Sequence, residues 1–243
     1  VNNHKAAAKS LIKADREMTR AHYGIPQDKF VFCCFNQLFK ISPDLFKAWI
    51  LILKAVDNSI LWLLEFPEAG KKNLLRHAFE MGVREDRFIF TPVAPRDEHI
   101  QRSALADLFL DTWSMNGAST ACDVLWAGTP LVTRQGDKMA ARVASSALSA
   151  LGLEELVAKT DVQYIELATE LALERDKLFD IRQRLARRRE GSALFDTERW
   201  VRNFEKGLLE IMARHEADRD PVDVRVEDTE PIVVEKDVEI AIL

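Results

Sequence analysis

Residues 30–64 read FVFCCFNQLFKISPDLFKAWILILKAVDNSILWLL, and this stretch decides the fold. It begins and ends with apolar runs, at 30–35 and 59–64, whose aromatic and branched residues are typical of buried strands. Between them, apolar residues recur at helical spacing behind a Ser-Pro pair, which predicts a helix over 43–56. A strand, a helix and a second strand in so short a stretch indicate a β–α–β unit with parallel strands.

The same alternation continues along the chain. Further strands are predicted at 88–91, 106–110 and 131–133, and further helices at 71–81, 97–105, 119–127, 139–150, 161–173, 175–190 and 197–214. The segment 232–243 is a candidate extra strand. Apolar strands joined by single helices predict an α/β fold, a doubly wound parallel Rossmann-like sheet with C-terminal helices. Trp49, Phe79 and Trp126 recur at helical spacing and are predicted to lie in the core.

Composition limits the classes of protein to which the chain can belong. Its 243 residues suffice for one sizeable α/β domain, and its net charge is −5. Ten acidic and three basic residues give 216–243 a charge of −7, which leaves about +2 for 1–215 and no positive excess for nucleic acid. No apolar run approaches the roughly 20 residues of a membrane span. Three cysteines are too few for a disulfide framework and favour a reducing compartment.

Five arginines lie close together on the helix predicted at 175–190. A solvated helix face fits this cluster, and so does a contact surface for a partner or for a missing part of the chain. The chain begins without Met and without the layout of a signal peptide, so we expect it to be part of a longer protein. The five arginines on the helix predicted at 175–190 are Arg182, Arg184, Arg187, Arg188 and Arg189.

Polar and charged side chains follow three of the predicted strands. In open parallel sheets, ligands bind beyond the carboxyl ends of the strands, so we expect these side chains to meet at one edge. Asn36, Gln37 and Lys40 follow the first strand, Arg96, His99 and Arg102 the third, and Asn116, Gly117, Ser119, Thr120 and Asp123 the fourth. Together they supply cations, a carboxylate and a loop of small residues.

The small-residue loop, NGASTACDVLWAG at 116–128, is the strongest of these features. It opens a helix with residues that let a ligand approach the backbone, and the free N–H groups of a helix N-terminus favour phosphate. Ser119 and Thr120 either add hydroxyl donors to such a site or only cap the helix. Asp123 either accepts from ribose hydroxyls or complements the helix dipole.

Lys40 and His99 also have two interpretations each. A lysine just past the first strand either neutralises a diphosphate leaving group or is an ordinary surface lysine. His99 either stacks on a base or is a helix-capping or exposed histidine. No P-loop, GxGxxG, HExxH or CxxC motif is present. The DxD at 218–220 has no apolar strand around it, and nothing else predicts a metal site.

Five segments, in this order and spacing, resemble the C-terminal catalytic half of the O-GlcNAc transferases. They are FNQLFKISP (35–43), SILWLLEFP (59–67), FTPVAP (90–95), LADLFLDT (105–112) and DVLWAGTPLVT (123–133). The resemblance runs from about Tyr23 to His215. It implies a nuclear and cytoplasmic glycosyltransferase of the GT-B fold, which moves N-acetylglucosamine from UDP-GlcNAc to Ser or Thr hydroxyls of proteins by inverting, metal-independent transfer. Protein O-fucosyltransferase, with GDP-fucose, resembles the chain less and is the alternative.

The resemblance also implies a role toward UDP for each matching residue. Lys40 would be the catalytic residue, because it would stabilise the leaving group. The implied contacts are Gln37, Lys40, Ser119 and Thr120 with the phosphates, Val93, Ala94, His99 and Arg102 with the uracil, and Arg96 and Asp123 with the ribose.

The donor loop departs from the family pattern. NGASTA at 116–121 stands where the family has NGHTTG, so Ala118 replaces a histidine, and an inactive nucleotide-sugar-binding module is a further alternative. The family's N-terminal catalytic half and its TPR repeats are outside this chain. We predict a linker or helix of that missing half over 1–25, a UDP-sugar-binding domain over 26–215 and an acidic tail over 216–243.

Overall fold

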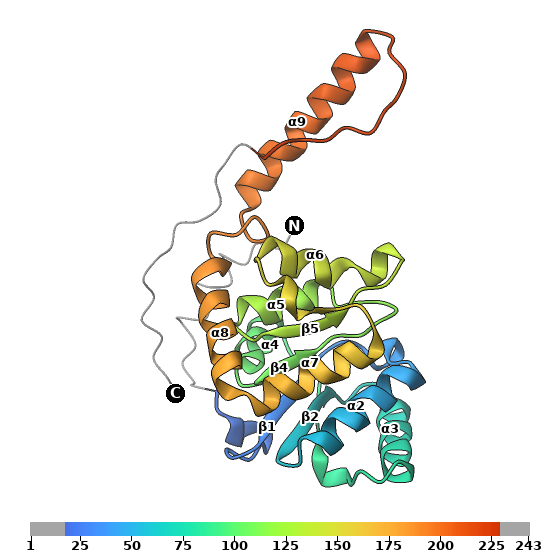
Figure 1. The fold of residues 1–243 in the computed structure, drawn as a ribbon, viewed down its shortest axis with the longest axis vertical. Coiled ribbons are helices and arrows are strands. Elements are labelled where there is room, and N and C mark those ends of the chain that lie inside the picture. Colours follow the sequence, from blue (N-terminus) through green and yellow to red (C-terminus); the bar gives the residue numbers. More distant parts are fainter. Residues whose placement is uncertain (1–17, 229–243) are drawn as a thin grey trace.

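A six-stranded parallel sheet forms the centre of the computed structural model, which describes residues 18–228 (Figure 1). Its strands lie in the order β3-β2-β1-β4-β5-β6, and all pairs are parallel. The strands are β1 (Phe30–Cys34), β2 (Ser59–Leu64), β3 (Phe88–Thr91), β4 (Leu108–Leu110), β5 (Leu131–Arg134) and β6 (Val157–Ala158). The doubly wound parallel sheet predicted from the sequence is therefore confirmed.

Helices cover both faces of the sheet. On one face α2 packs against α7, and on the other α4 packs against α5 (Figure 1). The α-helices are α2 (Pro43–Ala55), α3 (Glu68–Glu80), α4 (Arg96–Ser103), α5 (Ser119–Trp126), α6 (Val143–Ala150), α7 (Asp161–Leu173), α8 (Arg175–Arg189) and α9 (Thr197–Glu216). Short 3-10 turns are η1 (Arg20–Tyr23), η2 (Leu38–Lys40), η3 (Glu85–Arg87), η4 (Met139–Ala141) and η5 (Glu154–Leu156).

The first β–α–β unit shows why this sequence folds locally as it does. Ser42 caps α2, since its hydroxyl accepts from Leu45 N at 3.3 Å, and Pro43 occupies the first turn. All residues of β1 and β2 are buried, because α-helices lie over both faces of the sheet. Trp49 and Trp126 lie in the core as predicted. Phe79 does not: its side chain is 79% exposed, since it lies on the outer side of α3.

Two elements differ from the prediction. The helix expected over 139–150 is broken at Arg142, whose φ of −127° leaves the helical region, so η4 and α6 take its place. The two residues of β6 were not predicted, because so short a strand carries no periodic signal. The candidate strand at 232–243 lies outside the described residues.

The arginine cluster of α8 is not a solvated face. Arg188 donates to the carbonyl of Gly152 at 2.6 Å, just past α6, and Arg189 donates to that of Trp126 at 2.6 Å, the last residue of α5. Cations at these places satisfy free carbonyls and oppose the negative end of each helix dipole. Arg184 forms ion pairs with side chains and Arg187 is exposed. The cluster therefore fastens α8 to the helices beside it.

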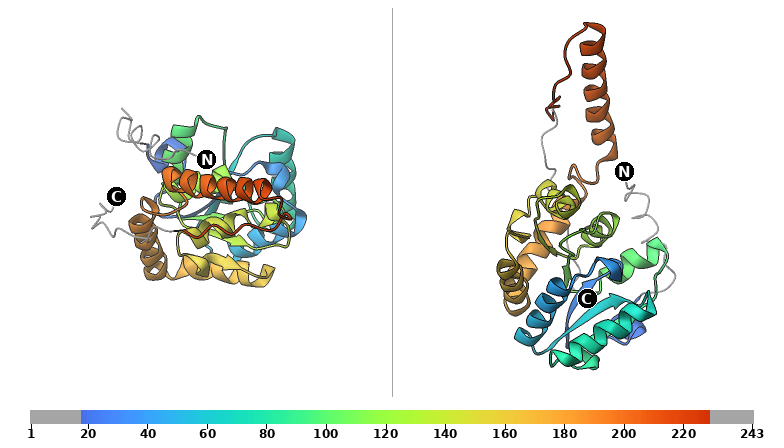
Figure 2. Two further views of the ribbon diagram at one scale, coloured as in Figure 1. Left: turned by 90° about the horizontal axis from the view of Figure 1, so that it is seen from above. Right: turned by 90° about the vertical axis from the view of Figure 1, so that its right-hand side faces the viewer.

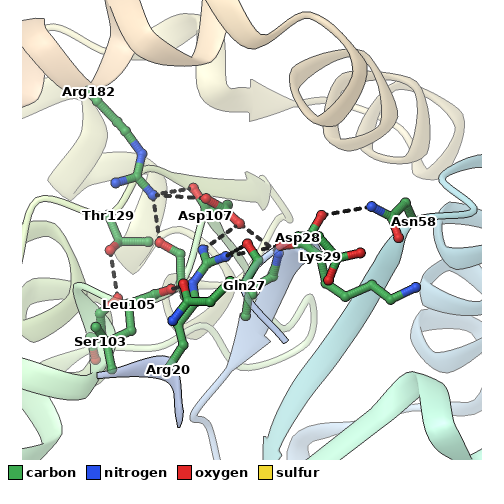
Figure 3. A network of polar contacts seen from close by, with 12 residues as sticks. Arg20, Gln27, Asp28, Lys29, Asn58, Ser103, Leu105, Asp107, Thr129 and Arg182 are labelled. Atoms are coloured by element: carbon green, nitrogen blue, oxygen red, sulfur yellow. Dashed lines mark hydrogen bonds and ion pairs between the residues drawn. The ribbon is translucent and has the colours of Figure 1, made fainter. Parts of the chain in front are cut away.

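Arg182, the remaining member, belongs to a polar network at the amino ends of β1 and β4 (Figure 3). At its centre the carboxylate of Asp107 accepts from Val31 N at 2.7 Å and from the guanidinium of Arg20 at 2.9 Å. Arg182 donates to the backbone carbonyl of Asp107 at 3.0 Å. The network joins the start of the described chain to α8 and to the sheet.

Helix α9 projects from the body of the molecule (Figures 1 and 2). Trp200 and Phe204 stack on each other at 5.0 Å along it and are about half-exposed. The chain then turns back along the helix, where Asp228 pairs with Arg199. The predicted domain boundaries stay a prediction, and α9 (Thr197–Glu216) crosses the one predicted between 215 and 216.

Candidate functional site

The carboxyl ends of β1 and β4 lie side by side at the centre of the sheet. The order 3-2-1-4-5-6 places the topological switch point between these two strands, because the chain runs outward from β1 to β3 and then from β4 to β6. Ligands of doubly wound sheets bind at such a point. The segment after β1 carries Asn36 to Lys40, and the loop after β4 leads to α5 at Ser119.

Lys40 lies against the loop that opens α5. Its ammonium group donates to the carbonyl of Asn116 at 3.0 Å, and Asn116 stands three residues before Ser119. The side chain is half-buried, and it lies on η2, directly after β1. The structure thus brings together the cation and the helix N-terminus that the sequence placed at one edge. Their contacts with UDP stay predictions.

The first turn of α5 is open to an anion. The N-cap residue is Ala118, whose methyl group cannot accept a hydrogen bond. Ser119 and Thr120 come after it, inside the first turn. Neither hydroxyl caps the helix, and the capping interpretation is therefore wrong. Ser119 is exposed and Thr120 half-exposed, so two hydroxyls accompany the N–H groups and the positive end of the helix dipole.

Arg96 and Asp123, both predicted to reach the ribose, form an ion pair with each other. The guanidinium of Arg96 lies 3.2 Å from the carboxylate of Asp123 and joins α4 to α5. Asp123 is nearly buried, whereas Arg96 is exposed. The pair borders the region beyond β3, so both residues lie near the predicted site, and their roles toward the ribose stay predictions.

His99 and Arg102 pack around Phe35, directly after β1. The ring of His99 meets that of Phe35 edge-on at 5.5 Å, and burial, together with the charge of Arg102, lowers the pKa of His99 to about 4. The imidazole is therefore neutral at pH 7, which suits stacking on a base. The guanidinium carbon of Arg102 also lies over the Phe35 ring, 4.8 Å from its centre.

Arg102 is deeply buried. It donates to the carbonyl of Pro92 at 2.8 Å and so supports the loop between β3 and α4. That loop presents Val93, which is exposed, and Ala94, which is half-buried. Gln37, at the start of η2, is also exposed. Arg102 thus stabilises the loop to which the resemblance assigns the uracil, and its own contact with the base stays a prediction.

Asp111 is the residue of this site that the sequence analysis did not single out. It follows β4 directly, is fully buried and lies at the centre of a hydrogen-bond network with Gly117, Thr133 and Asn36. Burial raises its pKa to about 6. An aspartate placed directly after an apolar strand was the available signal.

Residues 18–228, the part that the structure describes, contain neither a candidate membrane-spanning helix nor a candidate metal-binding group. None of their helices is both long enough and apolar enough to cross a membrane. None of their His, Cys, Asp and Glu side chains form a group of three or more that could hold a metal ion.

Comparison with known proteins decides the family. Residues 1–204 match the sequence profile of glycosyl transferase family 41. The chain belongs to that family. Family 41 relatives include the probable UDP-N-acetylglucosamine–peptide N-acetylglucosaminyltransferase SEC of Arabidopsis thaliana, 42% identical over 93% of this chain. The UDP-N-acetylglucosamine–peptide N-acetylglucosaminyltransferase of Caenorhabditis elegans is 42% identical over 94% of the chain.

A solved structure agrees with the sequence match. A mutant O-GlcNAc transferase from Thermobaculum terrenum superposes with a TM-score of 0.68 and 30% identity, over 78% of this chain and 36% of its own. The predicted fold, the C-terminal half of a GT-B enzyme, is supported by this match. The chain spans only 23% and 20% of the length of the plant and nematode relatives.

Proposed function

We propose that this chain is the donor-binding half of a protein O-GlcNAc transferase. The whole enzyme transfers N-acetylglucosamine from UDP-GlcNAc to Ser or Thr hydroxyls of proteins. The observation that carries the proposal is the contact of the Lys40 ammonium with the Asn116 carbonyl, 3.0 Å away, because it fixes a cation beside the open first turn of α5 at the switch point. The names of the plant and nematode relatives support the same donor and acceptor.

The arrangement suits the departure of UDP. As an acceptor hydroxyl attacks the anomeric carbon, the bond to the diphosphate breaks and negative charge grows on the leaving group. Lys40 and the N–H groups of α5 offset that charge from fixed positions. A single displacement inverts the anomeric carbon, and these groups supply positive charge from the protein itself, so we propose that transfer proceeds with inversion and without a metal ion.

The proposal extends to partners outside this chain. Protein acceptors and UDP-GlcNAc are the substrates, and an N-terminal catalytic half with TPR repeats completes the enzyme. We propose a nuclear and cytoplasmic location. None of the comparisons supports GDP-fucose as donor or an inactive binding module.

Calorimetry with UDP and GDP tests the donor assignment. We expect the chain to bind UDP at least tenfold more tightly than GDP, and UDP-GlcNAc more tightly than GDP-fucose. Preference for the guanine nucleotides would overturn the assignment. Fusion to the N-terminal half of a family 41 enzyme, followed by a sugar-transfer assay on a Ser/Thr peptide, then tests the activity.

A further inference from the structure

A buried carboxylate lies beneath the loop that opens α5. Asp111 accepts the N–H of Gly117 at 2.7 Å, the hydroxyl of Thr133 at 2.8 Å and the amide of Asn36 at 3.1 Å. These donors belong to the loop after β4, to β5 and to the segment after β1. One carboxylate therefore ties together the ends of three neighbouring strands at the switch point.

This network reaches the Lys40 contact through two adjacent residues. Gly117 directly precedes Ala118, the N-cap of α5, and directly follows Asn116, whose carbonyl accepts from Lys40. The side chain of Asn116 is fixed as well, since its amide donates to the carbonyl of Thr112 at 2.7 Å. Any displacement of Gly117 would therefore move both the partner of Lys40 and the start of α5.

The loop also has little free space around it. A Cβ atom on Gly117 would lie 3.0 Å from Asn36 Oδ1 and 3.2 Å from the backbone nitrogen of Ala121. Such distances are tighter than most contacts of real Cβ atoms. The backbone of Gly117 is thus held between the Asp111 carboxylate and the side chain of Asn36.

The chemistry of the network requires an acceptor at Asp111. A buried charge is costly unless hydrogen bonds compensate for it, and here all three neighbours are donors. An ionised carboxylate only accepts, so it satisfies all three. An amide at the same place has one oxygen for Gly117 and Asn36, and its NH2 group can bond Thr133 only if that hydroxyl turns to accept instead of donate.

We propose that Asp111 is a positioning residue of the nucleotide-binding site, which fixes the Asn116–Gly117 loop so that Lys40 and the first turn of α5 meet the diphosphate together. The inference rests on the proposed function. Asp111 acts through Gly117 and Asn116, whose backbone it holds in place. The required form of Asp111 is the ionised one.

Binding of UDP-GlcNAc to the full chain, measured by calorimetry, tests this inference with a matched pair of variants. Asp107 and Asp111 flank β4, and each carboxylate accepts a backbone N–H, but Asp107 lies at the opposite end of the strand. We expect Asp111→Asn to weaken binding at least tenfold. We expect Asp107→Asn to change the affinity less than twofold, although it loses the ion pair with Arg20. Both are measured well below their melting temperatures.

The pH profile separates positioning from general support of the fold. Since burial raises the pKa of Asp111 to about 6, its carboxyl takes up a proton between pH 7 and 5.5 and loses part of its accepting capacity. Cys34 on β1 and Tyr164 on α7 interact electrostatically with this carboxylate, and Lys40 on η2 interacts with Cys34 and binds the Asn116 carbonyl. Burial raises the pKa of both Cys34 and Tyr164, which therefore stay neutral in this range. Both phosphates of UDP-GlcNAc are esterified, so the charge of the donor is constant.

We therefore expect wild-type affinity for UDP-GlcNAc to fall at least threefold from pH 7 to 5.5, and the affinity of Asp111→Asn to stay flat. Thr133→Val removes one donor but keeps the carboxylate, so the fall should begin at higher pH. This variant and the wild-type profile decide the matter if Asp111→Asn does not fold. Equal affinities of wild type and Asp111→Asn, or a flat wild-type profile, would overturn the inference. A wild-type chain that binds no UDP-GlcNAc would instead overturn the proposed function.

Discussion

Lys40 combines a charge with a fixed position. Its ammonium is held on the Asn116 carbonyl, so the cation needs little rearrangement when negative charge develops nearby. The sequence predicted this residue correctly as a cation beyond the first strand. For Asp111 it offered only the position of an aspartate directly after an apolar strand, because the importance of that carboxylate depends on donors that come from three separate elements.

Replacement of Lys40 by alanine should lower turnover of the complete enzyme at least about a hundredfold. One preorganised group that stabilises a developing charge contributes roughly 3–4 kcal/mol to the transition state, and each 1.36 kcal/mol corresponds to about a factor of ten. Steady-state sugar transfer to a Ser/Thr peptide measures the effect. Lys47→Ala, on the exposed side of α2, is the control and should keep wild-type turnover. If Lys40→Ala retained near-normal turnover, Lys40 would have no part in catalysis.

Helix α8 is tied to α5 and α6 by arginines that donate to backbone carbonyls. Arg188 and Arg189 of α8 donate to carbonyls at the ends of α6 and α5, beside glycines in the left-handed conformation. Next to Gly152 the guanidinium is so close that a Cβ atom would lie 2.5 Å from Arg188 Nη1. Gly152 therefore serves both the turn and the approach of the arginine.

Gly152 and Gly24 allow the strain of a left-handed backbone to be separated from the displacement of Arg188. Gly152 and Gly24 have φ of +64° and +66°, but a Cβ on Gly24 meets nothing within 4 Å. Each Gly→Ala change imposes the left-handed strain of about 1–2 kcal/mol. Gly152→Ala must also displace Arg188 from its carbonyls, so we expect it to cost about 1 kcal/mol more. Urea denaturation of both variants measures the difference, and equal costs would show that Arg188 adjusts freely.

The two C-terminal helices should respond differently to loss of an apolar side chain. Leu185 of α8 is fully buried, whereas Leu209 of α9 is 70% exposed. We expect Leu185→Ala to lower the free energy of unfolding by about 2–5 kcal/mol and Leu209→Ala by less than about 0.5 kcal/mol. Thermal and urea unfolding measure both. A large loss for Leu209→Ala would mean that α9 contributes to the stability of the body.

Most elements could be predicted from sequence because apolar periodicity is a local property. The buried strands from β1 to β5 and the long helices follow from it, with shifts of a few residues at their ends. Phe79 was placed wrongly because helical spacing does not say which side of α3 faces the sheet. The arginines of α8 were misread because their carbonyl partners lie far away in sequence, 63 positions for Arg189 and Trp126.

The carboxyl and amino edges of the sheet, where its strands end and begin, have different roles in the molecule. The carboxyl edge gathers Lys40, the start of α5 and the loop after β3, whereas the amino edge holds the network around Asp107 (Figure 3). His99 belongs to the first of these edges and is held neutral in the folded protein. The unfolded chain takes up a proton at this histidine near its ordinary pKa of 6.5.

Acid should therefore destabilise the protein partly through His99. Its folded pKa, about 4, lies below the unfolded value, so the unfolded state binds more protons between pH 6.5 and 4. The stabilisation from neutral His99 is present above pH 6.5 and is lost as the pH falls through this range. We expect His99→Gln to lose less stability than wild type between pH 7 and 4.5 in urea denaturation. Asp111, whose folded pKa is raised, changes in the opposite direction but equally in both proteins. If the stability of wild type and of His99→Gln fell in parallel between pH 7 and 4.5, His99 would have no part in the loss.

Strand β4 is only three residues long, yet it has an aspartate at each end, with separate partners. A change in the loop after β4 can thus leave the contacts of Asp107, at the opposite end of the strand, intact. Substitution of the exposed Ala118 need not disturb Asp107 and its arginines, whereas the preceding Asn116 and Gly117 are held by Lys40 and Asp111.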